Sequence, residues 1–438
     1  MHHKRTLPEH IALRRRILVP QLRRRLLFLL GGITIGVLAV IMAKLADGAQ
    51  LVFFAAHGRW PLLPLFLTPA GFALLTWITR KYFPGAEGSG IQQVIAARSL
   101  ADQKDRGFLV PIRLAVAKIA LLTFGLAVGA SAGREGPTVQ VGAATMFALG
   151  RFQPHRQPGL LLAGASAGIA AAFNAPLAGI IFGIEEMSRS FEARSSVLVL
   201  ATVIAAGLTS LAILGDYTYF GVSSEGLIWG WQWAGVIVAG VAGGLLGGLF
   251  SRLVIAFSNG LPGLPGRLVK RWPILFAALC GLLVALSGMA AGGSVFGTGY
   301  AQAKEVLAGH VVPDLFGPLK LVATLLSTVS GIPGGIFSPS LAVGAGLAYN
   351  LAPLVPHVPI AAFAILCMAA YLSGVVQAPL TSFVIVEEMT GDHALIFPLM
   401  IAALLASAVS KMVCPDGIYH ALSKKFTAGK PLIDRTRN

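Results

Sequence analysis

The residues with the clearest chemical potential lie in one short segment bounded by Gly and Pro, Gly133-Arg134-Glu135-Gly136-Pro137. Pro suits a helix start, and a helix start presents free N–H groups and a positive dipole end, which together can bind an anion. A carboxylate can fill the anion position when ionised and leave it when protonated. Glu135 would then couple proton and anion occupancy. The alternative is a structural ion pair between Arg134 and Glu135.

Two further Gly-rich turns have the same potential. The second half of the chain contains Gly334-Gly335-Ile336-Phe337-Ser338-Pro339. This segment is another entry to an expected helix, and it carries no charge. Ser89, between Gly88 and Gly90, adds a turn with a hydroxyl donor, although a serine in a solvated turn is the plainer interpretation of that motif alone. Helix starts brought together by a pseudo-twofold axis would direct their N–H groups at one point.

Two carboxylate pairs, Glu185-Glu186 and Glu387-Glu388, each follow a long apolar run. For both pairs the structural interpretation is an interfacial carboxylate pair that caps a membrane span. Tyr419, close to the C-terminus, is on its local motif alone an ordinary interface aromatic.

The motifs recur at a fixed spacing, which requires elements that repeat. Pro137 and Pro339 lie 202 positions apart, and Pro176 and Pro379 lie 203 positions apart. Hydrophobic segments interrupted by Gly and Pro at matching places in two halves are typical of transporters whose site lies between structural repeats. The spacing therefore predicts repeats at about 110–214 and 233–413, with the function at the breaks.

The composition indicates a membrane protein. Hydrophobic residues make up 55% of the 438 residues and charged residues only 12%, whereas roughly a quarter of an average soluble domain is charged. Several apolar runs are shorter than the about 20 residues that a straight spanning helix needs. Tilted or half-spanning helices are expected, and these persist in a bilayer only where protein or a watery cavity satisfies their backbone groups.

The formal net charge of +16 comes largely from the two ends of the chain. Basic residues crowd the first 25 positions and the last 19, with Arg14-Arg15-Arg16 and Arg23-Arg24-Arg25 in the first cluster. The positive-inside rule predicts that both termini are cytoplasmic and face anionic lipid. This interpretation is preferred to nucleic-acid binding. We expect a basic arm at 1–25, one membrane domain at 26–419 and a short basic tail at 420–438, with no soluble regulatory domain after the membrane part.

Other chemistry is weakly indicated. Gly164-Ala165-Ser166-Ala167-Gly168 matches a hydrolase nucleophile pattern, but that pattern needs a strand-to-turn-to-helix setting. Here it lies in an Ala/Gly-rich apolar run, so helix packing is favoured and Ser166→Ala should have a mild effect. Asp392-His393 is too sparse for a metal site. We expect no enzyme activity, metal or cofactor. A cation carrier would need an acidic or carbonyl-lined centre in place of these helix starts.

Together these motifs resemble the CLC family of chloride channels and chloride/proton antiporters. The resemblance rests on the order of Gly-Ser-Gly-Ile at 88–91, Gly-Arg-Glu-Gly-Pro at 133–137, Gly-Ile-Phe-Ser-Pro at 335–339 and Tyr419. It covers nearly the whole chain and implies an all-α polytopic fold of two inverted repeats. It also implies a homodimer in which each subunit has its own anion pathway.

The resemblance assigns roles to individual residues. Ser89 and Tyr419 would hold a central chloride from the cytoplasmic side, with help from the backbone N–H groups of Ile336 and Phe337. Glu135 would be the external gating glutamate, beside Gly133 and Arg134 at the anion site. Glu186 would be the internal proton-transfer glutamate that antiporters carry.

The implied function is chloride/proton exchange across a bacterial inner membrane, with chloride, protons and lipids as partners. The alternative is a passive anion channel, or a variant with another anion selectivity. Serine at position 89 resembles chloride-preferring members and argues against the nitrate- and fluoride-selective types. One departure is Gln92, where the family commonly has Pro, and this bears on the start of the helix after Ser89.

Overall fold

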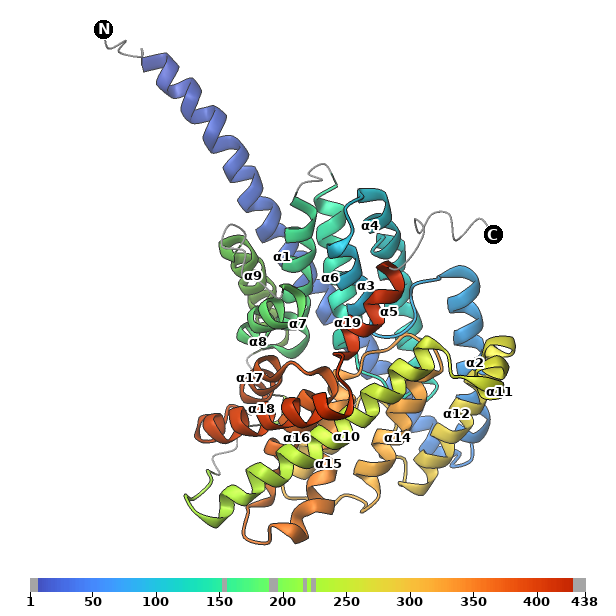
Figure 1. The fold of residues 1–438 in the computed structure, drawn as a ribbon. Coiled ribbons are helices and arrows are strands. Elements are labelled where there is room, and N and C mark those ends of the chain that lie inside the picture. The colour runs from blue at the N-terminus through green and yellow to red at the C-terminus, as the bar shows by residue number, and fades with distance from the viewer. Residues whose placement is uncertain (1–6, 152–155, 189–195, 216–218, 222–225, 428–438) are drawn as a thin grey trace.

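The computed structural model describes residues 7–151, 156–188, 196–215, 219–221 and 226–427, and within them it confirms an all-α fold. The first half contains α1 (Leu7–Arg59), α2 (Pro64–Tyr82), α3 (Ile91–Ser99), α4 (Gln103–Leu109), α5 (Ile112–Ala127), α6 (Glu135–Leu149), α7 (Gln157–Phe173), α8 (Pro176–Phe182), a π-helical turn at Gly183–Ser188 and α9 (Ser196–Leu214). The second half contains α10 (Ala234–Asn259), α11 (Gly263–Arg271), α12 (Pro273–Ala290), α13 (Tyr300–Leu307), α14 (Phe316–Val329), α15 (Phe337–Leu351), α16 (Ile360–Val376), α17 (Pro379–Thr390), α18 (Ile396–Val413) and α19 (Ile418–Thr427). Figure 1 shows most of the first half of the chain, blue to green, above most of the second half, yellow to red, with α2 beside α12 and α19 beside α3.

Helices of two lengths build the molecule. Six segments of the described chain are long and apolar enough to cross a membrane: Gln21–Arg59, Gln103–Ala127, Val197–Leu214, Trp231–Asn259, Pro273–Ala290 and His393–Val413. Others, such as α7, α14 and α16, are apolar but shorter. The short helices α6, α15 and α16 are almost wholly buried, as expected where surrounding protein must satisfy broken backbone.

The two halves repeat one packing scheme. The packing of α6 on α7 recurs as α15 on α16, and that of α7 on α9 recurs as α16 on α18. The packing of α1 on α9 likewise recurs as α10 on α18. The correspondence thus reaches α1, which precedes the 110–214 segment that the motifs alone indicated.

The breaks between helices repeat in backbone conformation as well. Asn174 (φ 53°) ends α7 and Gln377 (φ 58°) ends α16, and they are the non-Gly residues with positive φ in the described chain. Each is followed by Ala and then by a Pro that begins the next helix. Left-handed backbone is uncommon for residues other than Gly, although Asn adopts it more readily than most. Its occurrence at both places shows that the two breaks are the same structural feature.

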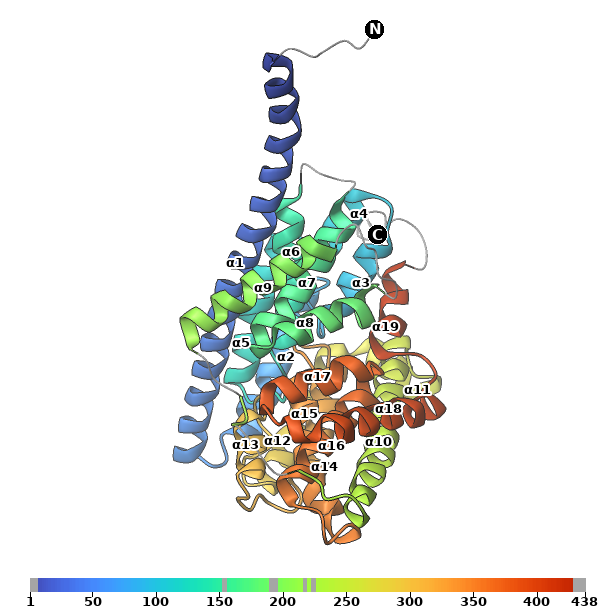
Figure 2. The same cartoon turned by 90° about the vertical axis from the view of Figure 1, so that its left-hand side faces the viewer.

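The last helix joins the halves. Figures 1 and 2 both show α19 beside α3, although the two helices come from opposite ends of the sequence. This contact brings Tyr419, at the start of α19, to the turn that contains Ser89. Lys4, Arg5 and the basic tail from 428 onward lie outside the described residues.

Candidate functional site

The two Gly-rich entries meet at the centre of the molecule. Gly133 N–H donates to the carbonyl of Gly335 and Gly335 N–H donates to the carbonyl of Gly133, both at 2.7 Å. This antiparallel bridge joins equivalent residues of the two repeats. It places the starts of α6 and α15 side by side, where neither first turn has intrahelical acceptors for its N–H groups. The predicted convergence of two helix starts is therefore present.

Glu135 places its carboxylate at the start of the opposite helix. The residue is fully buried. Its Oε2 accepts hydrogen bonds from Ser338 N–H at 3.3 Å and Ser338 Oγ at 3.0 Å. Its Oε1 accepts one from the Tyr300 hydroxyl at 2.8 Å. Because Ser338 lies in the first turn of α15, the carboxylate occupies the position that this helix start offers to an anion.

Arg134 is directed away from that position. Its Nη1 donates to Asp47 Oδ1 at 2.8 Å and to the Ala43 carbonyl at 3.1 Å, both on α1. Its Nη2 donates to the Tyr219 hydroxyl at 3.0 Å. Arg134 thus forms its ion pair with Asp47. The alternative that the sequence left open was an ion pair with Glu135. The two Nη atoms thus bind α1 and Tyr219, and the part of Arg134 beside Glu135 is its backbone at the start of α6.

Ser89 lies in a tight turn that is fixed from behind. Gly88 (φ 63°) and Gly90 (φ 98°) supply the left-handed backbone, which Gly adopts without steric cost. The ammonium of Lys118 donates to the carbonyls of Ala86 at 2.6 Å and Gly88 at 2.8 Å. Helix α3 begins at Ile91 directly after this turn. Its start is therefore intact, with Gln92 in place of the Pro that the resemblance implies.

Ser89 and Tyr419 are buried with their hydroxyls close to each other, and neither oxygen makes a hydrogen bond of normal geometry within the described protein. The Tyr419 ring stacks on Phe337, with centroids 6.1 Å apart and an interplanar angle of 14°. Buried polar groups nearly always find a partner, so two unpaired hydroxyls in one place call for an explanation. A bound anion would accept from both.

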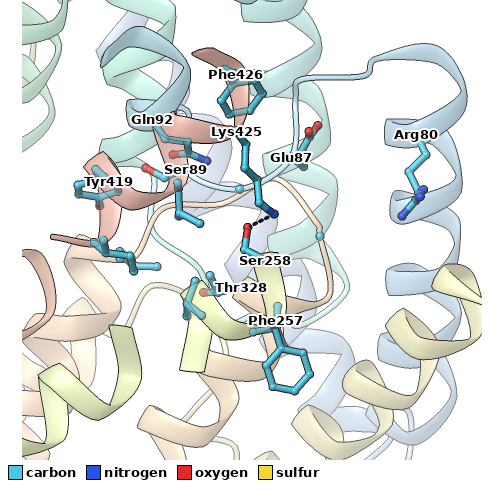
Figure 3. A pocket seen from close by; sticks show the side chains of 17 residues that line it. Arg80, Glu87, Ser89, Gln92, Phe257, Ser258, Thr328, Tyr419, Lys425 and Phe426 are labelled. Atoms are coloured by element: carbon cyan, nitrogen blue, oxygen red, sulfur yellow. Dashed lines mark hydrogen bonds between the residues drawn. The ribbon is translucent and has the colours of Figure 1, made fainter. Parts of the chain in front are cut away.

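A cavity of about 310 Å³ leads to these hydroxyls (Figure 3). Ser89, Ile336 and Tyr419 lie on its wall, and Gln92 joins them from α3. Its remaining lining includes charged side chains, namely Arg80, Glu87 and Lys425. The cavity thus extends from these charged residues to the two hydroxyls.

Lys425 links two elements at this cavity. Its ammonium donates to Ser258 Oγ at 2.6 Å, which ties α19 to α10. Partial burial is the main cause that lowers the pKa of Lys425; Glu87 acts in the opposite direction and Lys270 adds to the lowering. A positive charge here favours the entry of anions into the cavity.

Glu186 lies on the π-helical turn after α8 and is buried, with 5% of its surface exposed. Its Oε1 is 3.2 Å from Nδ1 of His420, whose side chain is 22% exposed. His420 follows Tyr419 on α19. One helix start therefore directs a tyrosine to the anion cavity and a histidine to the second buried glutamate. Neither Glu135 nor Glu186 lines the cavity itself.

The structure adds three side chains that the sequence reasoning did not select: Ser338, Tyr300 and His420. Ser338 lies inside the quoted Gly-Ile-Phe-Ser-Pro motif, and His420 is the neighbour of Tyr419. Tyr300 follows Gly297-Thr298-Gly299, which repeats the pattern of Gly88-Ser89-Gly90. A search for a second copy of that turn would have found it.

The hydrolase pattern and the metal alternative find no matching geometry. Ser166 lies inside α7, without the strand-to-helix turn that a nucleophile elbow needs. The nearby Gly164 packs against the backbone of Gly142, where a Cβ at either position would lie within 2.3 Å of a carbonyl oxygen. Small residues thus serve close helix packing. Within the described ranges, no three His, Cys, Asp or Glu side chains gather as a metal site.

Comparison with known proteins agrees with this geometry. Residues 71–411 match the family model described as voltage gated chloride channel. The chain is 32% identical over 406 residues to the H(+)/Cl(-) exchange transporter ClcA of Klebsiella pneumoniae subsp. pneumoniae, covering 88% of this chain and 82% of that protein.

Solved structures share the fold. A slow cyanobacterial Cl-/H+ antiporter superposes with a TM-score of 0.78 at 24% identity, covering 93% of this chain and 98% of the other. A CLC-type fluoride/proton antiporter superposes with a TM-score of 0.77 at 23% identity, covering 92% and 98%.

Proposed function

Because the chain belongs to the voltage-gated chloride channel family, we propose that it exchanges chloride for protons across a membrane. One observation carries the proposal: the Glu135 carboxylate lies on the first turn of α15, where an anion would bind. Chloride and this carboxylate compete for one position. A proton that neutralises Glu135 favours its release from the helix dipole and opens the position to chloride. Chloride and proton binding are thereby linked.

Chloride binds beside this position. The hydroxyls of Ser89 and Tyr419 donate to it, and the backbone N–H groups of Ile336 and Phe337 complete the coordination. Both hydroxyls are buried and unpaired in the described structure, so an anion satisfies donors that otherwise carry a desolvation cost. Gly133 and Arg134 contribute through the backbone that forms the start of α6.

Protons reach Glu135 by way of Glu186. This carboxylate is buried close to Tyr419, and its neighbour His420 is partly exposed. A histidine changes charge near neutral pH, which suits it to pass protons between water and a buried acid. Chloride and protons thus share the centre of the molecule but leave it by different routes.

We also propose the setting in which this exchange operates. The protein is a homodimer in the inner (plasma) membrane of a bacterium, in contact with lipids and not with nucleic acid. Both termini face the cytoplasm, as the positive-inside rule favours for the basic residues near the two ends. The protein is an ion transporter with chloride as its bound ion, and it needs no cofactor or metal.

The test uses purified protein in liposomes with a chloride gradient, while external pH is recorded. Uphill proton movement driven by chloride is expected for the wild type. Glu186→Gln should keep chloride flux and lose proton coupling, and Glu135→Ala should also abolish coupling. Chloride flux without proton movement in the wild type would overturn the proposal in favour of a passive channel. Replacing chloride by fluoride or nitrate tests the anion preference.

A further inference from the structure

Tyr300 contacts the gating carboxylate directly. It is the first residue of α13, and its hydroxyl donates to Glu135 Oε1 at 2.8 Å. The other oxygen of the same carboxylate accepts from Ser338. The carboxylate is therefore held from two elements of the second half, the start of α15 and the start of α13. Only the contact with Ser338 at the start of α15 belongs to the predicted anion position.

The turn before Tyr300 repeats the turn that carries Ser89. Gly297, Thr298 and Gly299 correspond to Gly88, Ser89 and Gly90. Both flanking glycines again have positive φ, 73° and 88°. A buried lysine again fixes the turn, because Lys320 donates to the carbonyls of Val295 and Gly297 at 2.8 Å each, as Lys118 does in the first half. The turn before Tyr300 is thus as firmly placed as the anion-binding turn.

The two turns present different donors to the centre. The hydroxyl of Ser89 has no partner in the described protein, whereas Thr298 directs its N–H at 2.8 Å and its Oγ1 at 3.1 Å to Gln50 Oε1. Both hydrogen-bond donors of Thr298 are therefore used by Gln50. The donor that the second turn offers to the centre is the hydroxyl of the next residue, Tyr300, and Glu135 receives it.

The tyrosine ring is fixed by its neighbours. It stacks on Tyr219, with centroids 5.0 Å apart and an interplanar angle of 24°, and it packs on Phe220 at 5.8 Å. The Arg134 guanidinium lies 5.5 Å from its centroid, within the range of a cation–π contact. A ring held on both sides presents its hydroxyl at a constant place, so this donor is preorganised for the carboxylate.

We propose that Tyr300 is a positioning residue that sets the pH at which Glu135 leaves the anion position. The inference rests on the proposed chloride/proton exchange and assigns its pH threshold to a hydroxyl outside the predicted site. A phenol that donates to an ionised carboxylate stabilises the ionised form over the neutral one. Tyr300 therefore favours the closed, ionised state, and more protons are needed to release Glu135.

Other groups near Glu135 act on the same equilibrium and are retained in the test. Arg134, Tyr300 and Tyr419 interact with Glu135 directly. Asp47 and Tyr219 act through Arg134, which they contact. Of these residues, Tyr300 donates a hydrogen bond to the Glu135 carboxylate from its hydroxyl, and Tyr300→Phe removes that hydrogen bond while it keeps the aromatic ring.

The experiment measures chloride flux from liposomes against pH for the wild type and Tyr300→Phe. The half-maximal pH should move upward by about one unit, because a hydrogen bond to a charged group contributes on the order of a tenfold change in proton affinity. The KM for chloride should fall, since the competing carboxylate is held less firmly. Tyr349→Phe is the matched control, because its hydroxyl donates to the remote His310 carbonyl.

A double variant separates the role of Tyr300 from a merely structural one. In a Glu135→Gln background, Tyr300→Phe should leave the pH profile unchanged. An upward shift that persists in this background would overturn the inference, as would a single variant whose profile matches the wild type. In both cases the wild type still exchanges chloride and the proposed function stands. A wild type that carries no chloride removes the proposed function, and this inference with it.

Discussion

Glu185 and Glu388 occupy equivalent places in the two repeats, and each caps a helix of the other half. Glu185 accepts from the N–H groups of Leu380 at 3.0 Å and Thr381 at 2.7 Å, in the first turn of α17. Glu388 accepts from the N–H groups of Leu177 at 3.1 Å and Ala178 at 2.6 Å, in the first turn of α8. The two glutamates lie 203 positions apart, as do Pro176 and Pro379. The carboxylates that were expected to cap their own spans therefore fasten the repeats together.

Removal of one of these helix caps should weaken the contact between the two repeats. Glu388→Ala leaves two N–H groups of α8 without an acceptor and removes a negative charge from a helix start. We expect the protein to lose on the order of 2 kcal/mol of stability, measured by thermal unfolding in detergent. Glu387→Ala is the matched control, because that carboxylate pairs with the exposed His393. An equal fall in Tm for both variants would contradict the assigned role.

Gly136 is required by the close approach of Ser89. A Cβ at position 136 would lie 2.0 Å from Ser89 Oγ, so Gly136→Ala must displace the hydroxyl. The variant should bind chloride at least about tenfold more weakly, which is the order expected for loss of one charge-assisted hydrogen bond. Isothermal titration with chloride measures this change. Gly48→Ala, where a Cβ would meet no atom within 4 Å, should bind as the wild type does; unchanged affinity in Gly136→Ala would refute the prediction.

Loss of an unpaired hydroxyl should cost affinity and not stability. Ser89→Ala and Tyr419→Phe each remove a buried donor that has no partner in the described protein. Chloride affinity should fall by about tenfold in each, while Tm in the absence of chloride stays equal or rises, because no protein hydrogen bond of normal geometry is lost. Tyr371→Phe serves as control, since its hydroxyl is also buried and unpaired but does not line the cavity. A large fall in Tm without a change in affinity would show a structural role.

His420→Gln should separate proton movement from chloride movement. The variant keeps a polar side chain beside Glu186 but cannot change its charge between pH 5 and 8. We expect proton flux to fall by about a hundredfold, the low end of the range for a lost acid–base group, while chloride moves with weakened coupling. His393→Gln removes a more exposed histidine and should preserve both fluxes. Proton flux at the wild-type rate in His420→Gln would mean that protons reach Glu186 by another route.

The sequence alone determined the features that depend on local backbone. Gly, Pro and apolar runs set where helices start, break and stop, and the matched spacing of the motifs predicts the repeats. The same local chemistry predicted helix starts with the capacity for an anion at 133–137 and 335–339, together with the Ser89 turn. These features are readable because glycine conformation, proline position and helix polarity depend on a few neighbouring residues.

Only the tertiary structure decided which side chains meet. Arg134 and Glu135 are adjacent in the sequence, where an ion pair between them is the obvious expectation. In the structure Arg134 pairs with Asp47 on α1, and Glu135 accepts a hydrogen bond from the Tyr300 hydroxyl on α13. His420 likewise reaches Glu186 because α19 packs against α3 of the first half. Such partners depend on how whole helices pack, because the packing energy of the buried helices determines where each side chain lies. The spacing of residues along the chain does not reveal these contacts.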